Sequence, residues 1–374
     1  MRIALLELKN FRCFTSFKHT FSGPLTLIEG PNGSGKTSLL EALHYACYGK
    51  SFRTSASDEL LMHAADATTS TLFIKIEVQE DETDRHTIQI GLSADKRSIK
   101  VDGQKISSYK ELLQHYRSIT ITEDDILIIK GAPEFRRAFL DQALTLHQPQ
   151  YASTLKIYRK ILKQRTALLL SDSAWNLASY ELWTEKLWGV AQQLQTERIA
   201  FLATLEQEIN LLIQKFFPEI PPLKLSYKPA SAETSLQAWM HTESYRERQA
   251  HRTLFGPHID DFTIVYGGKS SKTYASRGQQ KLIAVLLKVA HFFLLNKPSI
   301  ILLDDFMTDF DDSRLYALLD LFIQKKAHLI CTVPTKNSPL SLYLQKHGAE
   351  LLELLLPAQA LLLHDSAQQL QTPQ

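Results

Sequence analysis

Cysteine is scarce in this sequence. Three of the 374 residues are cysteines, and they lie far apart, at Cys13, Cys47 and Cys331. This spacing argues against a disulfide framework and against a Cys-x-x-Cys zinc site. A reducing cytoplasm is the compartment that such a chain fits best.

Net charge and long apolar runs are also nearly absent. The formal net charge is +2, with 42 Lys and Arg against 40 Asp and Glu, so a polyanionic partner would have to meet a local basic patch. The longest apolar run, residues 282–295, contains Lys288 and His291 and is too short to cross a bilayer. Glu7 and Lys9 interrupt the apolar N-terminus before a signal peptide can form. We therefore expect a soluble, cytoplasmic protein with no membrane partner.

A glycine-rich stretch at residues 30–38 is the strongest motif in the chain. It reads Gly-Pro-Asn-Gly-Ser-Gly-Lys-Thr-Ser and fits the phosphate-loop pattern G-x-x-x-x-G-K-[ST]. An apolar run at residues 25–28 precedes it, and helical spacing follows as far as about Tyr48, so the motif has the strand and helix that it requires. The residues expected to contact the nucleotide are Gly30, Pro31, Asn32, Gly33, Ser34, Gly35, Lys36, Thr37 and Ser38.

The chemistry of this loop explains its spacing. Glycines let successive backbone N–H groups turn towards a polyphosphate, and the start of the helix adds positive partial charge. Lys36 would act as the catalytic cation at the β- and γ-phosphates, and the hydroxyl of Thr37 would bind Mg²⁺. The loop therefore predicts ATP or GTP binding with Mg²⁺. A glycine-rich turn that matches the pattern by chance is the alternative.

An apolar run that ends in two acids predicts the second half of the site. Residues 299–303 indicate a buried central strand, with Asp304 and Asp305 at its carboxyl end. Asp304 would hold Mg²⁺, and Asp305 would orient or deprotonate the attacking water as a catalytic residue. A buried strand that simply meets solvent gives the same pattern, so the prediction depends on the phosphate loop.

The pattern of the sequence changes along the chain. Residues 71–101 are rich in β-formers and end in an Asp-Gly step, which predicts an antiparallel sheet in the same lobe as the phosphate loop. Residues 133–217 have helical periodicity, which predicts a short helical arm inserted in the nucleotide domain. The predicted fold class is α/β, a P-loop ATPase head with mixed sheets and an inserted helical lobe. The expected segments are the first part of the head at 1–130, the helical lobe at 131–220, the second part of the head at 221–363 and a polar tail at 364–374.

One predicted helix carries a stripe of positive charge. Lys156, Arg159, Lys160 and Lys163 stand at i, i+3, i+4 and i+7 and share one face, with Arg165 nearby. Such a stripe can neutralise the phosphates of double-stranded DNA and give salt-dependent affinity without sequence preference. An ordinary solvated helix face is the alternative.

A Ser-x-Gly-Gln element at residues 276–279 precedes an apolar helix. Taken alone, Ser276 is a helix cap. Before a strand that ends in Asp, however, the element resembles the signature motif of ABC-type ATPases, and residues 308–311 resemble their D-loop. The resemblance implies an ATP-dependent head-to-head homodimer, in which the signature of one subunit closes over the γ-phosphate held by the other. The nucleotide contacts that it adds are Ser276, Arg277, Gly278, Gln279, Asp309 and, at the switch position, Thr332.

Further segments narrow the resemblance to the RecF family, the bacterial recombination-mediator ATPases of the SMC-like branch, from residue 2 to about residue 335. These segments are 49–54 (Gly-Lys-Ser-Phe-Arg-Thr), 131–141, 162–165 (Leu-Lys-Gln-Arg), 256–261 (Gly-Pro-His-Ile-Asp-Asp) and 276–279 (Ser-Arg-Gly-Gln). The resemblance implies ATP and Mg²⁺ as cofactors, slow ATP hydrolysis and binding of double-stranded DNA near single-strand gaps. It also implies RecO and RecR as partners in loading RecA onto gapped DNA.

The chain departs from the ABC pattern at several positions. No glutamine stands at the lid position, residues 121–125, and Thr332 stands where many ABC ATPases have a switch histidine. Asp305 replaces the glutamate usual in transporters, which is consistent with slow turnover. Arg12 either reaches a nucleotide phosphate or is a surface arginine.

Two other ATPase classes are alternatives to the RecF-like interpretation. One is another SMC-like or ABC-type ATPase, for example in chromosome maintenance. The other is the nucleotide-binding subunit of a transporter, which would have a much shorter separation between Lys36 and Ser276 and a surface that couples to a membrane protein. A P-loop kinase or GTPase would need its own base-recognition motif, and we find none.

Overall fold

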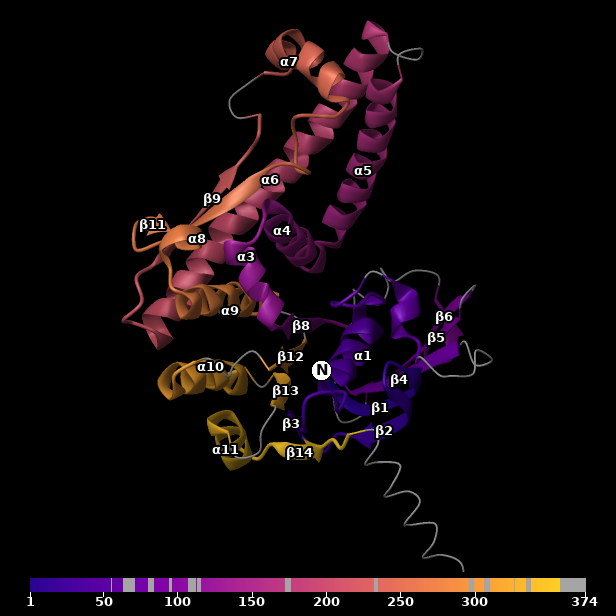
Figure 1. Cartoon of the computed structure of the whole chain (residues 1–374), viewed down its shortest axis with the longest axis vertical. Helices are drawn as coiled ribbons and strands as arrows, with labels where there is room; N and C mark the ends of the chain where they lie inside the picture. The colour runs from indigo at the N-terminus through magenta and orange to yellow at the C-terminus, as the bar shows by residue number, and fades with distance from the viewer. Residues whose placement is uncertain are drawn as a thin grey trace, which may run out of the picture. The chain divides into compact units, whose positions relative to one another are not determined.

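The computed structural model of this chain describes most of its residues (Figure 1). The described ranges are 1–54, 56–62, 71–79, 84–93, 96–106, 112, 116–171, 176–231, 235–295, 299–305, 310–325, 327–333 and 338–356. The chain forms two compact units, one from residues 1–123 and 297–374 and the other from residues 124–296. The second unit is thus inserted in the first along the sequence, and it takes in residues 221–296 besides the expected helical segment.

A parallel sheet forms the first layer of the unit that contains the phosphate loop. Its strand order is β14-β3-β13-β12-β8, and every neighbouring pair is parallel. The strands are β3 (Leu25–Glu29), β8 (Ser118–Ile121), β12 (Ile300–Asp304), β13 (His328–Val333) and β14 (Glu350–Glu353). The inner strands are almost wholly buried, which explains why their sequences are continuous apolar runs instead of alternating ones.

An antiparallel sheet forms the second layer of the same unit, with the strand order β2-β1-β4-β5-β6-β7. Its strands are β1 (Arg2–Phe11), β2 (Phe14–Thr20), β4 (Thr71–Gln79), β5 (Arg85–Ser93), β6 (Arg97–Val101) and β7 (Gln104–Lys105). Burial alternates along β4 because one face of this sheet meets the core. Since β4 pairs with β1, the β-rich segment belongs to the phosphate-loop unit, as predicted.

Helix α1 (Lys36–Tyr48) is held between these two sheets. It contacts β1, β4 and β5 of the antiparallel sheet and β8, β12 and β13 of the parallel sheet. All of its residues except Thr37 are buried, as expected for a helix enclosed on every side. Helices α10 (Asp312–Gln324) and α11 (Pro339–Lys346) lie on the other side of the parallel sheet (Figure 1). A short turn of helix, η1 (Ser57–Leu60), follows α1.

The inserted unit is built on two long helices. Helix α5 (Pro149–Leu170) packs along α6 (Leu177–Phe216), which has 40 residues (Figure 1). The other elements of residues 123–296 are η2 (Glu123–Ile126), α3 (Leu127–Lys130), α4 (Pro133–His147), β9 (Leu223–Lys228), α7 (Leu236–Ala250), β10 (Asp261–Tyr266), β11 (Lys269–Ser270), α8 (Ser271–Tyr274) and α9 (Arg277–Leu294). Strands β9, β10 and β11 form an antiparallel sheet, and both β9 and α9 pack against α6. None of the helices in the described part of the chain combines the length and the apolar character needed to cross a membrane.

Arg165, which follows the basic stripe of α5 in the sequence, does not share its exposed face. Its side chain is fully buried and forms an ion pair with the equally buried Glu247 of α7. Its guanidinium also donates to the hydroxyls of Thr253, at 2.7 Å, and Thr184, at 3.1 Å. The physical reason is helical periodicity, since Arg165 follows Lys156 by nine residues and therefore lies on the opposite side of the helix.

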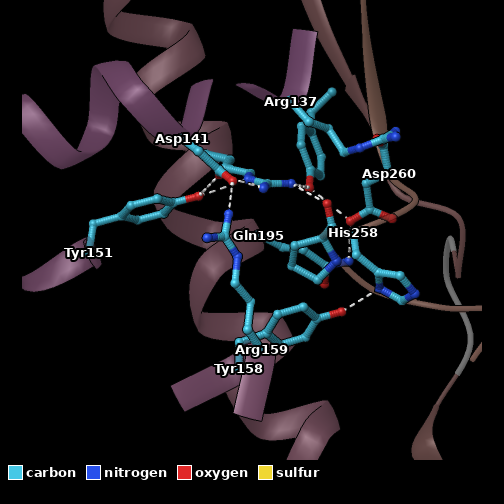
Figure 2. A network of polar contacts seen from close by, with 11 residues as sticks. Arg137, Asp141, Tyr151, Tyr158, Arg159, Gln195, His258 and Asp260 are labelled. Atoms are coloured by element: carbon cyan, nitrogen blue, oxygen red, sulfur yellow. Dashed lines mark hydrogen bonds and ion pairs between the residues drawn. The ribbon is translucent and has the colours of Figure 1, made fainter. Parts of the chain in front are cut away.

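A second buried arginine, Arg198, joins several elements of this unit. Figure 2 shows the polar network to which its partners Asp141 and Tyr151 belong. Arg198 of α6 donates to the carboxylate of Asp141 in α4 at 2.7 Å and to the hydroxyl of Tyr151 in α5 at 3.0 Å. It also donates to the carbonyl of Pro257 at 2.7 Å. Asp260 lies in the same loop and accepts hydrogen bonds from α6 and from β9. The segment 256–261 therefore joins the long helices to the small sheet.

We expect the buried pair of Arg165 and Glu247 to be a main source of stability in the inserted unit. Changing Glu247→Ala would leave a buried guanidinium without its counter-charge, which costs about 3–5 kcal/mol. Urea denaturation followed by circular dichroism measures this loss of unfolding free energy. The matched control is Arg246→Ala on the same helix, because Arg246 is 69% exposed and pairs with Glu243, and such a pair contributes about 0–1 kcal/mol. Equal losses in the two variants would contradict the prediction.

Candidate functional site

Five residues predicted from the sequence meet at the carboxyl edge of the parallel sheet. Lys36 and Thr37 begin α1, Asp304 and Asp305 end β12, and Thr332 lies on β13, the strand between β12 and β3. The strand order brings them together because the carboxyl ends of parallel strands share one edge.

Hydroxyl groups tie the two halves of the site together. The Thr37 hydroxyl donates to Asp304 Oδ1 at 3.0 Å, and the Thr332 hydroxyl lies 3.0 Å from the same oxygen. Thr332 Oγ1 also accepts the backbone N–H of Asp305 at 2.9 Å. Asp304 therefore faces the threonine of the phosphate loop, and Thr332 fixes the two acids relative to each other.

Lys36 is folded back onto its own loop. Its side chain is only 5% exposed, and its ammonium donates to the carbonyls of Gly30, at 2.8 Å, and Pro31, at 3.3 Å. The same ammonium lies 3.9 Å from Asp305 Oδ2. Lys36, which is predicted to bind the phosphates, thus lies beside Asp305, which is predicted to act on the attacking water.

The loop has a backbone that only glycine allows at its critical points. Gly35 has φ +98°, and a Cβ there would come within 2.7 Å of both Cys13 Sγ and the Phe14 ring. A Cβ on Gly30 would come within 2.6 Å of the carbonyl of Leu354. These contacts leave no room for a side chain, so the loop keeps its N–H groups accessible.

Burial and charge act on the two acids at the end of β12. Desolvation raises the pKa of Asp304, the nearby charge of Asp305 raises that pKa further, and the hydrogen bonds from Thr332 and Thr37 oppose both effects. The net direction is upward. Asp305 has φ +44°, a left-handed conformation that is uncommon for a residue other than glycine and is often found at functional sites.

The residues at this edge fit ATP and Mg²⁺. The Ser34 hydroxyl is buried in the loop without a hydrogen-bond partner among the described residues, as expected of a group that awaits a phosphate oxygen. The Thr37 hydroxyl and the Asp304 carboxylate are oxygen donors, the type that Mg²⁺ prefers. Asn32, Gly33 and Ser38 lie in the same loop and first turn of α1.

A cluster around Glu41 adds three residues to which the sequence analysis gave no role, Glu41, Ser51 and Arg53. Glu41 of α1 is fully buried, and Arg12 binds it through two hydrogen bonds of 2.6 and 2.8 Å. Ser51 also donates to Glu41, and Arg53 lies 3.6 Å away. The charge of Arg53 also acts on Asp304, in the direction that lowers its pKa. The one acid in a mostly apolar helix was the available signal, because a carboxylate that becomes buried needs partners.

The hydrogen bonds of Arg12 affect its predicted role as a contact to a nucleotide phosphate. A third nitrogen, Nη1, donates to the carbonyl of Glu59 at 2.5 Å, so each of the three guanidinium nitrogens makes a hydrogen bond within the protein. Hydrogen bonding to Glu41 raises the pKa of Arg12. A phosphate contact by Arg12 stays a prediction and would require the side chain to leave Glu41 or share it.

The signature residues lie in the inserted unit, where they begin α9. Ser276 accepts the N–H of Gln279 at 3.3 Å, and Gln279 Oε1 accepts the N–H of Ser276 at 2.8 Å, which is a capping box. Ser276, Arg277 and Gly278 are exposed. The helix-cap role is confirmed, whereas the action across a dimer stays a prediction. Asp309 of the predicted D-loop lies outside the described residues.

The basic stripe of α5 is open to solvent. Lys156, Lys160 and Lys163 are exposed and form no ion pair with any residue in the described ranges. Arg159 is 67% exposed and lies 3.4 Å from Asp141, itself held by Arg198. The stripe therefore presents three cations that no acid among the described residues neutralises.

Similarity to known proteins settles the family. The RecF protein of Chlorobium phaeovibrioides is 32% identical over 91% of this chain and 95% of its own length. That of Acholeplasma laidlawii is 31% identical over 83% of this chain and 88% of its own length. The chain belongs to the RecF family. The AAA domain family also matches residues 5–218.

Solved structures agree with this assignment. A structure of the recombination mediator protein RecF with ATP, in the RecFOR pathway, superposes with a TM-score of 0.80 at 26% identity, covering 90% of this chain and 93% of that one. The Smc head bound to the C-winged-helix domain of ScpA superposes with a TM-score of 0.55 at 16% identity, covering 91% of each chain, which shows the fold alone. The predicted fold class, an ABC-type P-loop ATPase head with a helical insertion, is confirmed.

The raised pKa of Asp304 leads to a prediction about stability. A carboxyl whose pKa is higher in the folded protein than in the unfolded chain costs folding free energy at every pH above the raised value, and the cost disappears as the pH falls towards about 3.9. Asp304→Asn should therefore raise the melting temperature of the nucleotide-free protein at neutral pH while abolishing Mg²⁺-dependent nucleotide binding.

The control for this prediction is an acid whose pKa is shifted in the opposite direction. Asp311 caps α10, and hydrogen bonds from Ser313 and from the backbone of Arg314 lower its pKa. Asp311→Ala should therefore lower stability, by about 1 kcal/mol. Differential scanning fluorimetry measures both variants. A lower melting temperature for Asp304→Asn would contradict the stated cost of burying the acid.

Proposed function

We propose that this protein is an ATP-dependent DNA-binding ATPase of recombinational repair and replication restart. It would dimerise head to head on ATP, bind double-stranded DNA near single-strand gaps and hydrolyse ATP slowly. With RecO and RecR it would promote the loading of RecA. The observation that carries the proposal is the grouping of Lys36, Thr37, Asp304 and Asp305 at one sheet edge in a chain of the RecF family.

The resting geometry supports a role for each residue in hydrolysis. Bound ATP and Mg²⁺ would supply the transferred phosphoryl group and the charge that neutralises it. Lys36 would exchange the carbonyls of its own loop for phosphate oxygens, and Thr37 and Asp304 would hold the metal. Asp305 would then orient the attacking water, with Thr332 fixing the backbone that carries it. An aspartate reaches less far than a glutamate, in keeping with slow turnover.

The exposed signature element supports dimer formation. The capping box orders the first turn of α9 in the absence of nucleotide, and Ser276 remains exposed. Across a dimer, Ser276 and the N–H groups of this turn would meet the γ-phosphate held by the partner subunit. Dimerisation would then depend on ATP because the phosphate bridges two protein surfaces.

Several features support DNA as the macromolecular partner and the cytoplasm as the compartment. The exposed lysines of α5 offer sequence-independent phosphate contacts. The relatives are named as DNA replication and repair proteins, and the similar solved structures belong to the RecFOR pathway. The three free cysteines suit a reducing compartment.

Light scattering with and without ATP tests the nucleotide-dependent dimer. Lys36→Ala should remain a monomer because it loses phosphate binding, whereas Asp305→Asn should form a longer-lived dimer because hydrolysis is blocked. Ser276→Asp keeps a good helix cap but places a carboxylate against the γ-phosphate. It should bind ATP with affinity close to that of the wild type, yet stay monomeric. ATP-dependent dimers in Lys36→Ala or Ser276→Asp would refute the proposed site or its action across the dimer.

The salt dependence of duplex binding tests the basic stripe. Removing Lys156, Lys160 and Lys163 together by alanine substitution should weaken binding for all sequences and reduce the slope of log affinity against log salt by about 0.9 for each lysine that contacts a phosphate. Fluorescence anisotropy with labelled gapped duplex and ATP measures the affinity at each salt concentration. Lys215→Ala, an exposed lysine at the far end of α6, is the control for a change of charge alone. An unchanged slope in the triple variant would exclude the stripe from the interface.

A further inference from the structure

A pocket of about 580 Å³ lies beside α1, and its lining residue Arg53 is 3.6 Å from Glu41 in the second turn of that helix. Its walls are the C-terminal end of α1, residues of the segment 49–60 that follows, and Arg97 of β6. None of residues 30–38 lines it. Helix α1 spans about 20 Å, so the wall formed by Tyr45 and Gly49 stands well apart from the loop at the start of the helix. The volume lies within the range typical of small-ligand sites.

Hydrogen bonds hold both walls in place without a ligand. Ser51 binds the buried carboxylate of Glu41 and accepts the N–H groups of Arg53, at 2.9 Å, and Thr54, at 3.1 Å. On the opposite wall, Arg97 donates to the carbonyl of Gly49. The pocket is therefore already formed in the resting protein, and a ligand would not have to open it.

The lining of the pocket is cationic and aromatic. Lys50, Arg53 and Arg97 contribute positive charge, and no described lining residue is an acid. Lys50 is exposed and makes no hydrogen bond or ion pair with the residues that the structure describes. The Arg97 guanidinium lies over the Tyr45 ring, 5.3 Å from its centre, and Phe52 adds a second ring to the lining. Cations favour a phosphate, and aromatic rings and a stacked guanidinium favour a nucleobase.

We propose that this pocket binds a nucleotide unit that carries a terminal phosphate. A terminal phosphate has more negative charge than an internal phosphodiester, which suits a concave surface lined by Lys50 and Arg97, with Arg53 shared with the buried Glu41. A concave pocket also admits a strand end or a free nucleotide, whereas the backbone of a continuous duplex would only pass over it. Lys50 and Arg97 bind the phosphate, and the aromatic side chains face the base. The choice of a DNA strand end as the source of this nucleotide unit rests on the proposed function, whereas the proposal that the pocket binds such a unit does not.

The test uses single-stranded oligonucleotides with and without a 5′-phosphate. Both carry a fluorescent label at the 3′ end, and anisotropy is measured on the full-length Lys36→Ala protein without ATP, so that the phosphate loop takes no part. The phosphorylated strand should bind about tenfold more tightly, as expected for charge-assisted hydrogen bonds to a phosphate. Arg97→Ala and Lys50→Ala should each remove most of this difference, and thermal melting verifies that they fold. Equal binding of the two strands by the parent protein would overturn the proposal.

Lys100→Ala is the matched control, because Lys100 is an exposed cation on β6 that does not line the pocket. It should leave the phosphate-dependent difference intact, as should the triple change on α5. Failure of the α5 prediction and failure of the pocket are therefore distinguishable. Competition with dAMP separates the two sources, since displacement of the phosphorylated strand at similar concentration assigns the pocket to free nucleotides, and weaker displacement assigns it to strand ends.

One outcome would assign the pocket to the ATP site. If Arg97→Ala weakens ATP binding in the protein with Lys36 intact and leaves the strand-end difference unchanged, the pocket serves ATP and the proposal is wrong. If Arg97→Ala removes the strand-end difference and leaves ATP binding unchanged, the pocket is a second, separate nucleotide site.

Discussion

The buried carboxylate of Glu41 is the constraint on which the phosphate-loop unit depends. A carboxylate without solvent is stable only when cations and hydrogen-bond donors surround it. Glu41 obtains them from Arg12, which follows β1, and from Ser51 and Arg53, which follow α1. The need to neutralise one charge thus holds the start of the antiparallel sheet, the phosphate-loop helix and the next segment together. One wall of the pocket beside α1 is held by the same carboxylate.

The carboxyl edge of the parallel sheet depends on topology as much as on local sequence. Thr37 and Asp304 are 267 residues apart in the chain, yet they share a hydrogen bond because β3 and β12 both flank β13. Thr332, on that intervening strand, is placed to bind both acids of β12. A threonine fits here because one hydroxyl can donate to a carboxylate and accept a backbone N–H at once. The strained backbone of Asp305 is held by this contact.

Sequence patterns predicted the parts of the fold that depend on residues close together in the chain. The phosphate loop, its flanking strand and helix, and the strand that ends in Asp304 follow from glycine geometry and from continuous apolar runs. The partners of buried charges could not be predicted in this way. Glu247 lies 82 residues from Arg165, and no periodicity connects them. The extent of the inserted unit was also out of reach, because β9 and α9 join it through packing against α6 and β10 joins it by pairing with β9, and not through any pattern of their own.

Helix α5 shows that one family motif can contain both an exposed cation and a buried cation. The segment Leu-Lys-Gln-Arg at 162–165 contains Lys163, which faces solvent, and Arg165, which is buried against Glu247. A fixed motif therefore does not imply a shared role, since two residues apart on a helix means nearly opposite faces. The buried face fixes α5 through the ion pair of Arg165 with Glu247, and the lysines of the exposed face form no ion pair with the residues that the structure describes. Because stability and surface charge are separated on this helix, its lysines can contact a polyanion without changing how the unit folds.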